Sequence, residues 1–221
     1  MTDRSSAKRR AAELAVDRVE SGMVIGLGTG STAGLAVEEL GRRLATGALR
    51  NVLGVATSRA TARLAAASGV PLTRLDDRPV LDLAIDGADE VDPEGRLVKG
   101  AGGALLWEKI VARAATRFVV AVDRSKLVDR LGRRAPVPVE VVPFGWVTHV
   151  EPIRFLGAEP VLRMGQEGTP FRTDEGHFII DARFPEGLPD PERIERVLRR
   201  RAGIVETGLF LDFEPEVVVG D

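Results

Sequence analysis

The stretch MVIGLGTGSTAGLAVEELGRRL, residues 23–44, joins an apolar run, a glycine-rich turn and a helical pattern. MVIGL (23–27) has the composition of a buried strand, and the apolar positions after the turn recur at helical spacing. Similar strand patterns at 51–56, 79–86 and 117–123 alternate with helix patterns at 58–68 and 103–116. This alternation predicts βαβ units and a parallel sheet, preceded by a helix from about Ser5 to Glu20.

The pattern changes near Gly132. RRAPVPVEVVPFGW is punctuated by proline and strand-like, and a helix, two strands, a helix and a strand follow at about 146–156, 160–164, 177–184, 191–201 and 204–209. This order is typical of a ferredoxin-like layer, and PEVVVG (215–220) predicts a strand that returns to the first domain. The predicted fold class is therefore α/β. It comprises a Rossmann-like parallel-sheet domain, 1–132 with 210–221, and a smaller ferredoxin-like α+β domain, 133–209.

Composition narrows the function. The chain has 221 residues, 44% of them hydrophobic and 29% charged, and its net charge of -2 argues against a general nucleic-acid partner. The absence of cysteine excludes disulfides and thiol catalysis, and two histidines are too few for a histidine-rich metal site. No signal-peptide pattern is present, and no apolar run approaches the roughly 20 residues of a membrane span. We expect a cytoplasmic protein with no membrane partner.

The glycine-rich turn GLGTGST (26–32) could bind an anion through backbone N–H groups. A dinucleotide fingerprint requires a third glycine where this chain has Ser31, and a P-loop requires a lysine after Gly30. Two interpretations remain. The turn is either a tight connection with Ser31 as the helix N-cap, or a phosphate or sugar site that adds the hydroxyls of Thr29, Ser31 and Thr32.

An acidic turn, AIDGADEVD (84–92), follows a later strand pattern. Asp86 ends that strand, at the edge where open α/β sheets bind ligands. The acids fall at positions 1, 4, 5 and 7 of the turn, which does not match an EF-hand. For Glu90 and Asp92 we expect a solvated polar loop.

KGAGGALLWEK (99–109) places a lysine and glycines before a helix. Lys99 and the backbone amides form an arrangement that stabilises developing negative charge on oxygen. Apolar neighbours would desolvate the Glu108 carboxylate in the second turn of the helix, which suits a general base. Helix statistics alone favour a surface glutamate paired with Arg113 or Lys109. Lys126, in VAVDRSK, is available to a phosphate or is simply solvated.

The motifs GxGTGST, DGAD, KGxGGALxxEK and DxSK, in this order and spacing, resemble the type A family of ribose-5-phosphate isomerases. The resemblance covers nearly the whole chain and includes TSRAT (57–61), PVEVVPF (138–144), IIDARF (179–184) and VETGLF (205–210). It implies an enzyme of the non-oxidative pentose phosphate pathway that interconverts D-ribose 5-phosphate and D-ribulose 5-phosphate through an enediolate. A homodimer or homotetramer without cofactor is implied as well.

The resemblance also assigns roles to residues. Glu108 matches the proton-transferring glutamate, and Lys99 would bind the oxyanion. Asp86 and Asp89 are candidates for ring opening, and which of them donates a proton and which accepts one stays open. The substrate-binding residues implied are Thr29, Gly30, Ser31, Thr32, Asp86, Gly87, Ala88, Asp89, Lys99, Gly100, Ala101, Gly102 and Lys126. We expect no metal, because Lys99 already supplies positive charge. The family commonly has arginine just before the glutamate, and this chain has Trp107 there.

Three further classes of protein stay open. A non-catalytic sugar-phosphate sensor could use the same sheet, but it has no need of Glu108 and Lys99. A nucleotide-dependent oxidoreductase is disfavoured, because the acid that would bind a ribose is missing. An acyl-CoA transferase would use Glu108 as a nucleophile.

Overall fold

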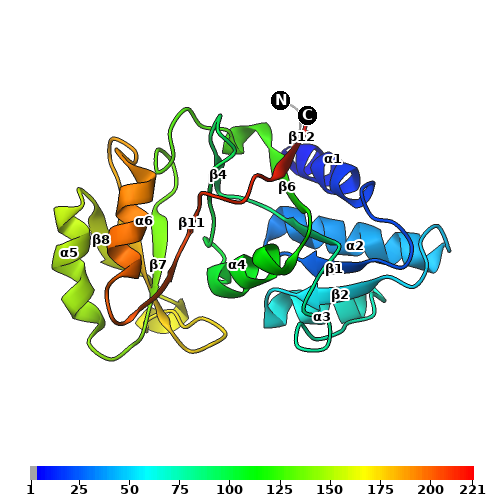
Figure 1. Ribbon diagram of the computed structural model, residues 1–221, viewed down its shortest axis with the longest axis horizontal. Coiled ribbons are helices and arrows are strands. Elements are labelled where there is room, and N and C mark those ends of the chain that lie inside the picture. The colour runs from blue at the N-terminus through cyan, green and yellow to red at the C-terminus, as the bar shows by residue number, and fades with distance from the viewer. Residues whose placement is uncertain (1–3) are drawn as a thin grey trace. The chain divides into compact units, whose positions relative to one another are not determined.

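The computed structural model describes residues 4–221, apart from the side chain of residue 167 (Figure 1). Contacts divide the chain into two compact units. The first contains the residues up to Ala88, then Trp107–Lys126 and Phe213–Asp221, and the second contains Asp89–Leu106 and Leu127–Asp212. The expected domain ranges, 1–132 and 133–209, stay predictions. The contact units differ from them chiefly in that residues 89–106 group with the second unit.

The first unit is built on a parallel sheet of five strands in the order β12-β6-β3-β1-β2. Its elements are α1 (Arg4–Val16), β1 (Val24–Leu27), α2 (Ser31–Ala45), β2 (Leu53–Ala56), α3 (Arg59–Ala67), β3 (Leu83–Asp86), most of α4 (Leu105–Ala114), β6 (Phe118–Asp123), η1 (Arg124–Lys126) and β12 (Glu216–Gly220). The predicted parallel sheet is confirmed, and β12 returns to it beside β6. Helix α1 ends at Val16, four residues before the predicted end at Glu20, and the side chain of Val19, beyond the helix, is buried in the core.

Alternation along the strands divides the core of this unit between two faces of the sheet. Ile25 and Leu27 of β1 lie in one buried cluster with residues of α1 and α2. Gly26 faces the other way, where a Cβ would come within 2.4 Å of the Val111 side chain on α4. Because successive side chains of a strand point to opposite faces, α1 and α2 cover one face and α4 covers the other.

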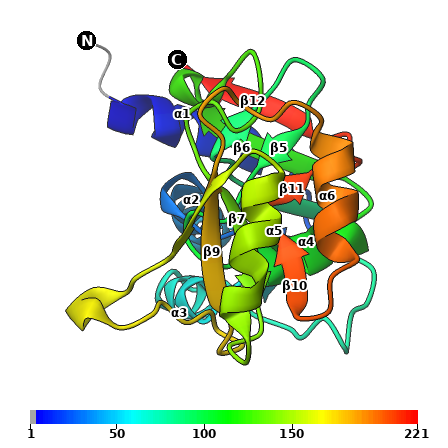
Figure 2. The same ribbon diagram turned by 90° about the vertical axis from the view of Figure 1, so that its left-hand side faces the viewer.

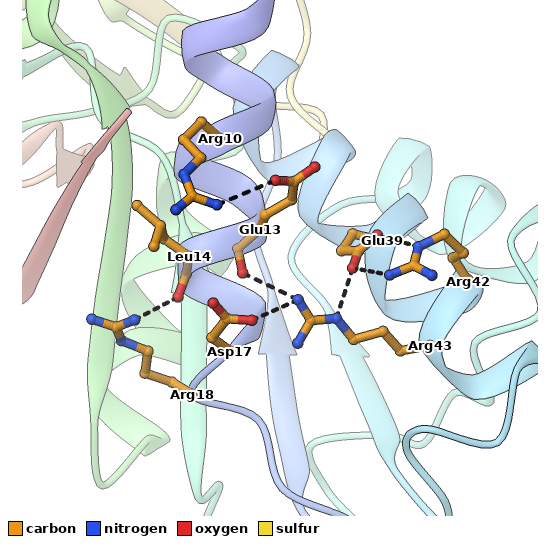
Figure 3. Close-up of polar contacts among 8 residues, drawn as sticks. All are labelled: Arg10, Glu13, Leu14, Asp17, Arg18, Glu39, Arg42 and Arg43. Carbon is orange, nitrogen blue, oxygen red and sulfur yellow. Dashed lines mark hydrogen bonds and ion pairs between the residues drawn. The ribbon is translucent and has the colours of Figure 1, made fainter. Parts of the chain in front are cut away.

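Helices α1 and α2 are also joined at the surface by an ionic network (Figure 3). Arg43 donates to the Glu39 carboxylate on its own helix at 2.7 Å and to Asp17, just after α1, also at 2.7 Å. Arg42 contacts both oxygens of Glu39 at 2.6 and 2.7 Å. The hydrogen bonds from Arg42, assisted by Arg43, lower the pKa of Glu39 to about 2, against the effect of its burial.

The second unit contains a four-stranded antiparallel sheet in the order β10-β7-β9-β8. Its elements are β4 (Glu90–Val91), β5 (Leu97–Val98), β7 (Val137–Val141), η2 (Trp146–His149), α5 (Val150–Phe155), β8 (Glu159–Leu162), η3 (Gln166–Gly168), β9 (Phe178–Arg183), α6 (Pro191–Arg199), β10 (Ile204–Thr207) and β11 (Leu209–Phe210). The predicted β-α-β-β-α-β order is confirmed, and with it the α/β fold class. Figure 2 shows α5 and α6 beside this sheet, and one buried cluster joins Ile153 and Ile194 of these helices to β7.

A third, three-stranded sheet, β11-β5-β4, was not expected. Strands of two residues carry no apolar alternation that a sequence pattern could reveal. The pairing of β5 with β4 and β11 explains why residues 89–106 belong with the second unit.

The expectation that Glu90 and Asp92 lie in a solvated loop was wrong. Glu90 is fully buried on β4, and its carboxylate accepts N–H groups of Gly132, Arg134 and Ala135 at 2.5–2.7 Å. Asp92 is 5% exposed and accepts from the Arg96 side chain at 2.7 Å. Both buried carboxylates are hydrogen-bonded to neighbouring segments of the unit and so help to fix its fold.

None of the helices found over residues 4–221 has the length and apolar character needed to cross a membrane. The expected cytoplasmic location stays a prediction.

Candidate active site

The parallel sheet has its topological switch point between β1 and β3. The chain leaves β1 through α2 toward β2 on one side, whereas β3 pairs with β1 on the other side. In sheets of this order, ligands bind where the loops after two such strands diverge. The loops are the first glycine turn, which begins at Gly28, and residues 86–88 after β3. The sequence-predicted residues Thr29–Thr32 and Asp86–Ala88 therefore lie at one edge of the first unit.

Direct contact joins the two loops. Asp86 is 3% exposed, and its Oδ1 accepts the N–H of Thr29 at 3.2 Å and of Gly87 at 2.7 Å. A Cβ on Gly28 would lie 2.1 Å from Asp86 Oδ1 and 2.6 Å from Asp86 Cα. Only glycine at position 28 lets the turn approach the carboxylate so closely, although sequence analysis assigned no role to this residue.

The side chain of Thr29 points into the protein. Its Oγ1 lies 2.8–2.9 Å from the hydroxyl oxygens of Thr57, Ser58 and Thr61, which are all buried. Ser58 is the N-cap of α3 and accepts the N–H of Thr61 at 2.9 Å. This hydroxyl cluster fixes the first glycine turn. The motif TSRAT, noted only as part of the family resemblance, was the signal for it.

Helix α2 begins at the end of the same turn. Its N-cap is Gly30, with φ 119°, and Ser31 is the first helical residue. Of the two interpretations of the turn, the one with Ser31 as the N-cap was therefore wrong in that detail. The Ser31 hydroxyl instead accepts from the Lys8 ammonium of α1 at 2.8 Å. A cation thus lies at the start of α2, where N–H groups already favour an anion. The sequence pattern did not identify Lys8 as a residue near this turn.

Glu108 lies on α4, in the first unit, and is 4% exposed. The helix begins at Leu105, so Glu108 lies in its first turn. The sequence had predicted the second turn. Burial excludes a solvent-exposed surface glutamate at this position.

Lys126 ends the short helix η1, which follows β6. This turn is held by Asp123, whose Oδ1 accepts the N–H of Ser125 at 3.0 Å, while Arg4 donates to the Ser125 hydroxyl at 2.8 Å. Burial tends to raise the pKa of Asp123, but hydrogen bonds from Ser125 and the charge of Arg4 lower it below its ordinary value. The carboxylate therefore stays ionised and keeps the turn before Lys126 in shape.

The remaining predicted residues, Asp89 and Lys99–Gly102, belong to the second unit. Asp89 Oδ2 accepts the N–H of Ala101 at 2.9 Å, which joins the acidic loop to the second glycine loop. Lys99 is 2% exposed, and its ammonium lies 5.5 Å from the ring centroid of Phe210. A Cβ on Gly208 would lie 2.2 Å from the Lys99 carbonyl oxygen, so this glycine of VETGLF is required by close packing.

Among the residues that the structure describes, no group of three or more histidine, aspartate or glutamate side chains is placed to hold a metal ion.

A parallel sheet with a glycine-rich turn and an acidic loop at its switch point, in a chain whose second unit contains a lysine-glycine loop, is typical of an α/β enzyme that acts on a small ligand. The chain belongs to the ribose 5-phosphate isomerase A (phosphoriboisomerase A) family, whose model matches residues 53–221.

Similar proteins cover almost the whole chain. Ribose-5-phosphate isomerase A of Roseiflexus castenholzii is 54% identical over 212 residues, which are 96% of this chain and 90% of that protein. The protein of the same name from Thermosynechococcus vestitus is 48% identical over 215 residues, 97% of this chain and 91% of the relative.

Solved structures agree in fold. A D-ribose-5-phosphate isomerase in complex with phospho-erythronic acid is 43% identical, covers 96% of this chain and 93% of its own, and gives a TM-score of 0.93. Ribose 5-phosphate isomerase A of Methanocaldococcus jannaschii is 41% identical, covers 97% and 94%, and gives 0.90.

Proposed function

We propose that Glu108 is the base in this chain's interconversion of D-ribose 5-phosphate and D-ribulose 5-phosphate. As a member of the family, the chain catalyses this reaction. In the open-chain aldose, Glu108 removes the proton from C2, which leaves an enediolate. It then returns the proton to C1 while the hydroxyl proton passes from O2 to O1, and the ketose is formed. The observation that carries the assignment is a carboxylate that is 4% exposed, on a helix of the unit that contains the switch-point loops. Burial removes water from the carboxylate, which raises the free energy of its charged form and suits a group that must accept a proton.

The proposed roles of Asp86 and Asp89 concern the step before proton transfer. The sugar phosphate is largely a closed ring, so the anomeric hydroxyl must lose a proton and the ring oxygen must gain one. Each carboxylate accepts backbone N–H groups, Asp86 from Thr29 and Gly87, and Asp89 from Ala101. These bonds orient the two carboxylates in their loops.

Charge on the substrate is proposed to be balanced by the two glycine loops. The N–H groups at the start of α2, with Gly30, Ser31 and Thr32, suit a phosphate, and Lys126 adds a cation. Lys99 and the N–H groups of Gly100 and Gly102 suit the enediolate oxygens. The relative solved in complex with phospho-erythronic acid supports a small phosphorylated ligand for this chain.

The test of the reaction is ketose formation from ribose 5-phosphate by the purified protein, with and without EDTA. We expect turnover that the chelator does not change. Turnover lost with EDTA and restored by a divalent cation would contradict the metal-free mechanism. A folded protein that binds the sugar phosphate without turnover would favour the sensor. Binding of a nicotinamide nucleotide would favour an oxidoreductase, and covalent capture of Glu108 by an acyl-CoA would favour a transferase.

We further propose that the chain forms a homodimer or homotetramer and serves the non-oxidative pentose phosphate pathway. Two phenylalanines of the second unit support an interface, since Phe144 is 93% and Phe155 87% exposed. Light scattering coupled to size-exclusion chromatography tests this. We expect the oligomer to dissociate when both residues are replaced by serine, and an unchanged mass would place the interface elsewhere.

A further inference from the structure

Arg163, which follows β8, has no part in the site described above, yet it contacts the second glycine loop. Its guanidinium donates to the carbonyl oxygens of Gly100 at 2.9 Å and Ala101 at 3.1 Å. All three residues belong to the second unit. Arginine thus binds two successive peptide groups of the loop that carries Lys99.

The guanidinium is itself held in place. Arg163 donates to both carboxylate oxygens of Asp181 on β9, at 2.9 and 2.5 Å, in the two-point geometry that makes such pairs strong and directional. The Arg163 side chain is 14% exposed. Asp181 binds Nε and Nη2 and so fixes the plane of the guanidinium. The position of Nη1, which donates to the loop carbonyls, is therefore defined as well.

The same hairpin adds a packing contact. The N–H of Phe171 donates to the Arg163 carbonyl oxygen at 2.9 Å, and the centroid of its ring lies 5.7 Å from Arg163 Cζ. A Cβ on Gly103 would come within 2.4 Å of the Phe171 ring. The segment between β8 and β9, in yellow in Figure 2, therefore contacts both ends of the glycine loop.

The contacts with Arg163 also determine the direction of N–H groups in the loop. In a trans peptide the C=O of one residue and the N–H of the next point in opposite directions, and the described chain contains no cis bond. With the carbonyls of Gly100 and Ala101 on Arg163, the N–H groups of Ala101 and Gly102 both point away from it. The first of these donates to Asp89 at 2.9 Å. The anion bound on this side of the loop is thus the Asp89 carboxylate, and the Gly102 N–H points to the same side.

We propose that Arg163, anchored by Asp181, is a positioning residue that holds the second glycine loop with the Ala101 N–H on the Asp89 carboxylate and the Gly102 N–H turned toward the enediolate. The inference rests on the proposed function, in which this loop stabilises the enediolate. Loss of the guanidinium would let the two peptides rotate. Such a change acts on the transition state more than on substrate binding, so it appears in kcat.

The first experiment compares Arg163→Met with Arg172→Met. Arg172 is a matched control on the same hairpin, since it donates to the Gly176 carbonyl at 2.9 Å and lies 4.9 Å from the Phe178 ring. We expect Arg163→Met to lower kcat by about 100-fold, with KM much less changed, and the control to keep its kcat. A lysine at 163 keeps the charge but not the fork, so Arg163→Lys should recover only part of kcat.

Two further measurements separate positioning from general stability. Amide hydrogen exchange should rise at residues 99–103 in Arg163→Met and stay unchanged in the helices α5 and α6. In Arg163→Ala, added guanidinium chloride at low millimolar concentration should restore part of kcat. A near-normal kcat in Arg163→Met, or exchange that rises throughout the second unit, would overturn the proposal. If the unmodified protein shows no isomerase activity, the proposed function fails, and exchange at 99–103 still decides whether Arg163 holds the loop.

Discussion

The carboxylate of Asp86 accepts the N–H of Thr29 at 3.2 Å, across 57 positions of sequence. This hydrogen bond fixes the acidic loop after β3 against the glycine turn after β1. It forms because Gly28 brings no side chain between them. The geometry of the proposed ring-opening carboxylate thus depends on a residue that has no functional group.

Gly28→Ala tests this dependence. The new Cβ would overlap Asp86, including its Cα, so the loop must shift, and we expect kcat/KM to fall by about 100-fold with the fold retained. The control is Gly34→Ala on α2, whose Cβ would meet only a Leu64 methyl at 3.3 Å. Steady-state kinetics and thermal unfolding of both variants decide the matter, and equal kinetics in the two would refute the argument.

Glu108→Gln should reduce turnover by about a thousandfold or more, because the amide cannot accept the C2 proton. The substitution changes little volume, so binding of the sugar phosphate, measured by calorimetry, should persist. Glu38→Gln serves as the control, since Glu38 is an exposed glutamate on α2. A Glu108→Gln enzyme that retains most of its turnover would remove Glu108 as the base.

Glu39 should give acid-dependent stability. Its pKa is lowered from the ordinary 4.5 to about 2, so its ionised form stabilises the folded protein fully above pH 4.5 and loses this effect as pH falls toward 2. Glu39→Gln should therefore be less stable than the unmodified protein at neutral pH, by about 0.5–1 kcal/mol for a surface network. Urea unfolding at several pH values should show this gap closing below pH 4.5. A gap independent of pH would contradict the prediction.

The contribution of Glu140 to stability should change with pH in the opposite direction. Burial raises the pKa of this carboxyl on β7, against hydrogen bonds from His177 and Thr173, each at 2.9 Å. A raised pKa gives a stabilising contribution that is complete below the ordinary value of 4.5 and declines as pH rises through the folded value. The stability of the unmodified protein relative to Glu140→Gln should therefore fall as pH rises above 4.5. The same urea series measures it, and a rising difference would show that the sign is wrong.

The two main sheets could be predicted because strands such as 117–123 and 177–184 are long enough to show their pattern, and helices separate them at regular intervals. The small sheet could not, since two-residue strands such as Leu97–Val98 show no periodicity. Glu90 was misjudged for a related reason. Its partners are backbone N–H groups at 132–135, and no side-chain type in the sequence reveals them.

Some residues of the candidate site could likewise be predicted from the sequence and others could not. Residues that carry charge or sit in glycine motifs, such as Lys99 and Asp86, were identified from the sequence as candidates. Residues that act through the backbone were missed. Gly28 works through the space it leaves, and Arg163 through two carbonyl oxygens, so neither has a sequence signature of its own.

Strand β12 forms an edge of the first unit's sheet, although the stretch Leu127–Asp212 of the second unit precedes it in the chain. It also lies directly against α1, because a Cβ on Gly220 would come within 1.8 Å of the Ala7 carbonyl. During synthesis, α1 and β6 leave the ribosome well before β12. The first unit therefore keeps an open sheet edge until the second unit has emerged, and its completion follows translation of the whole intervening segment.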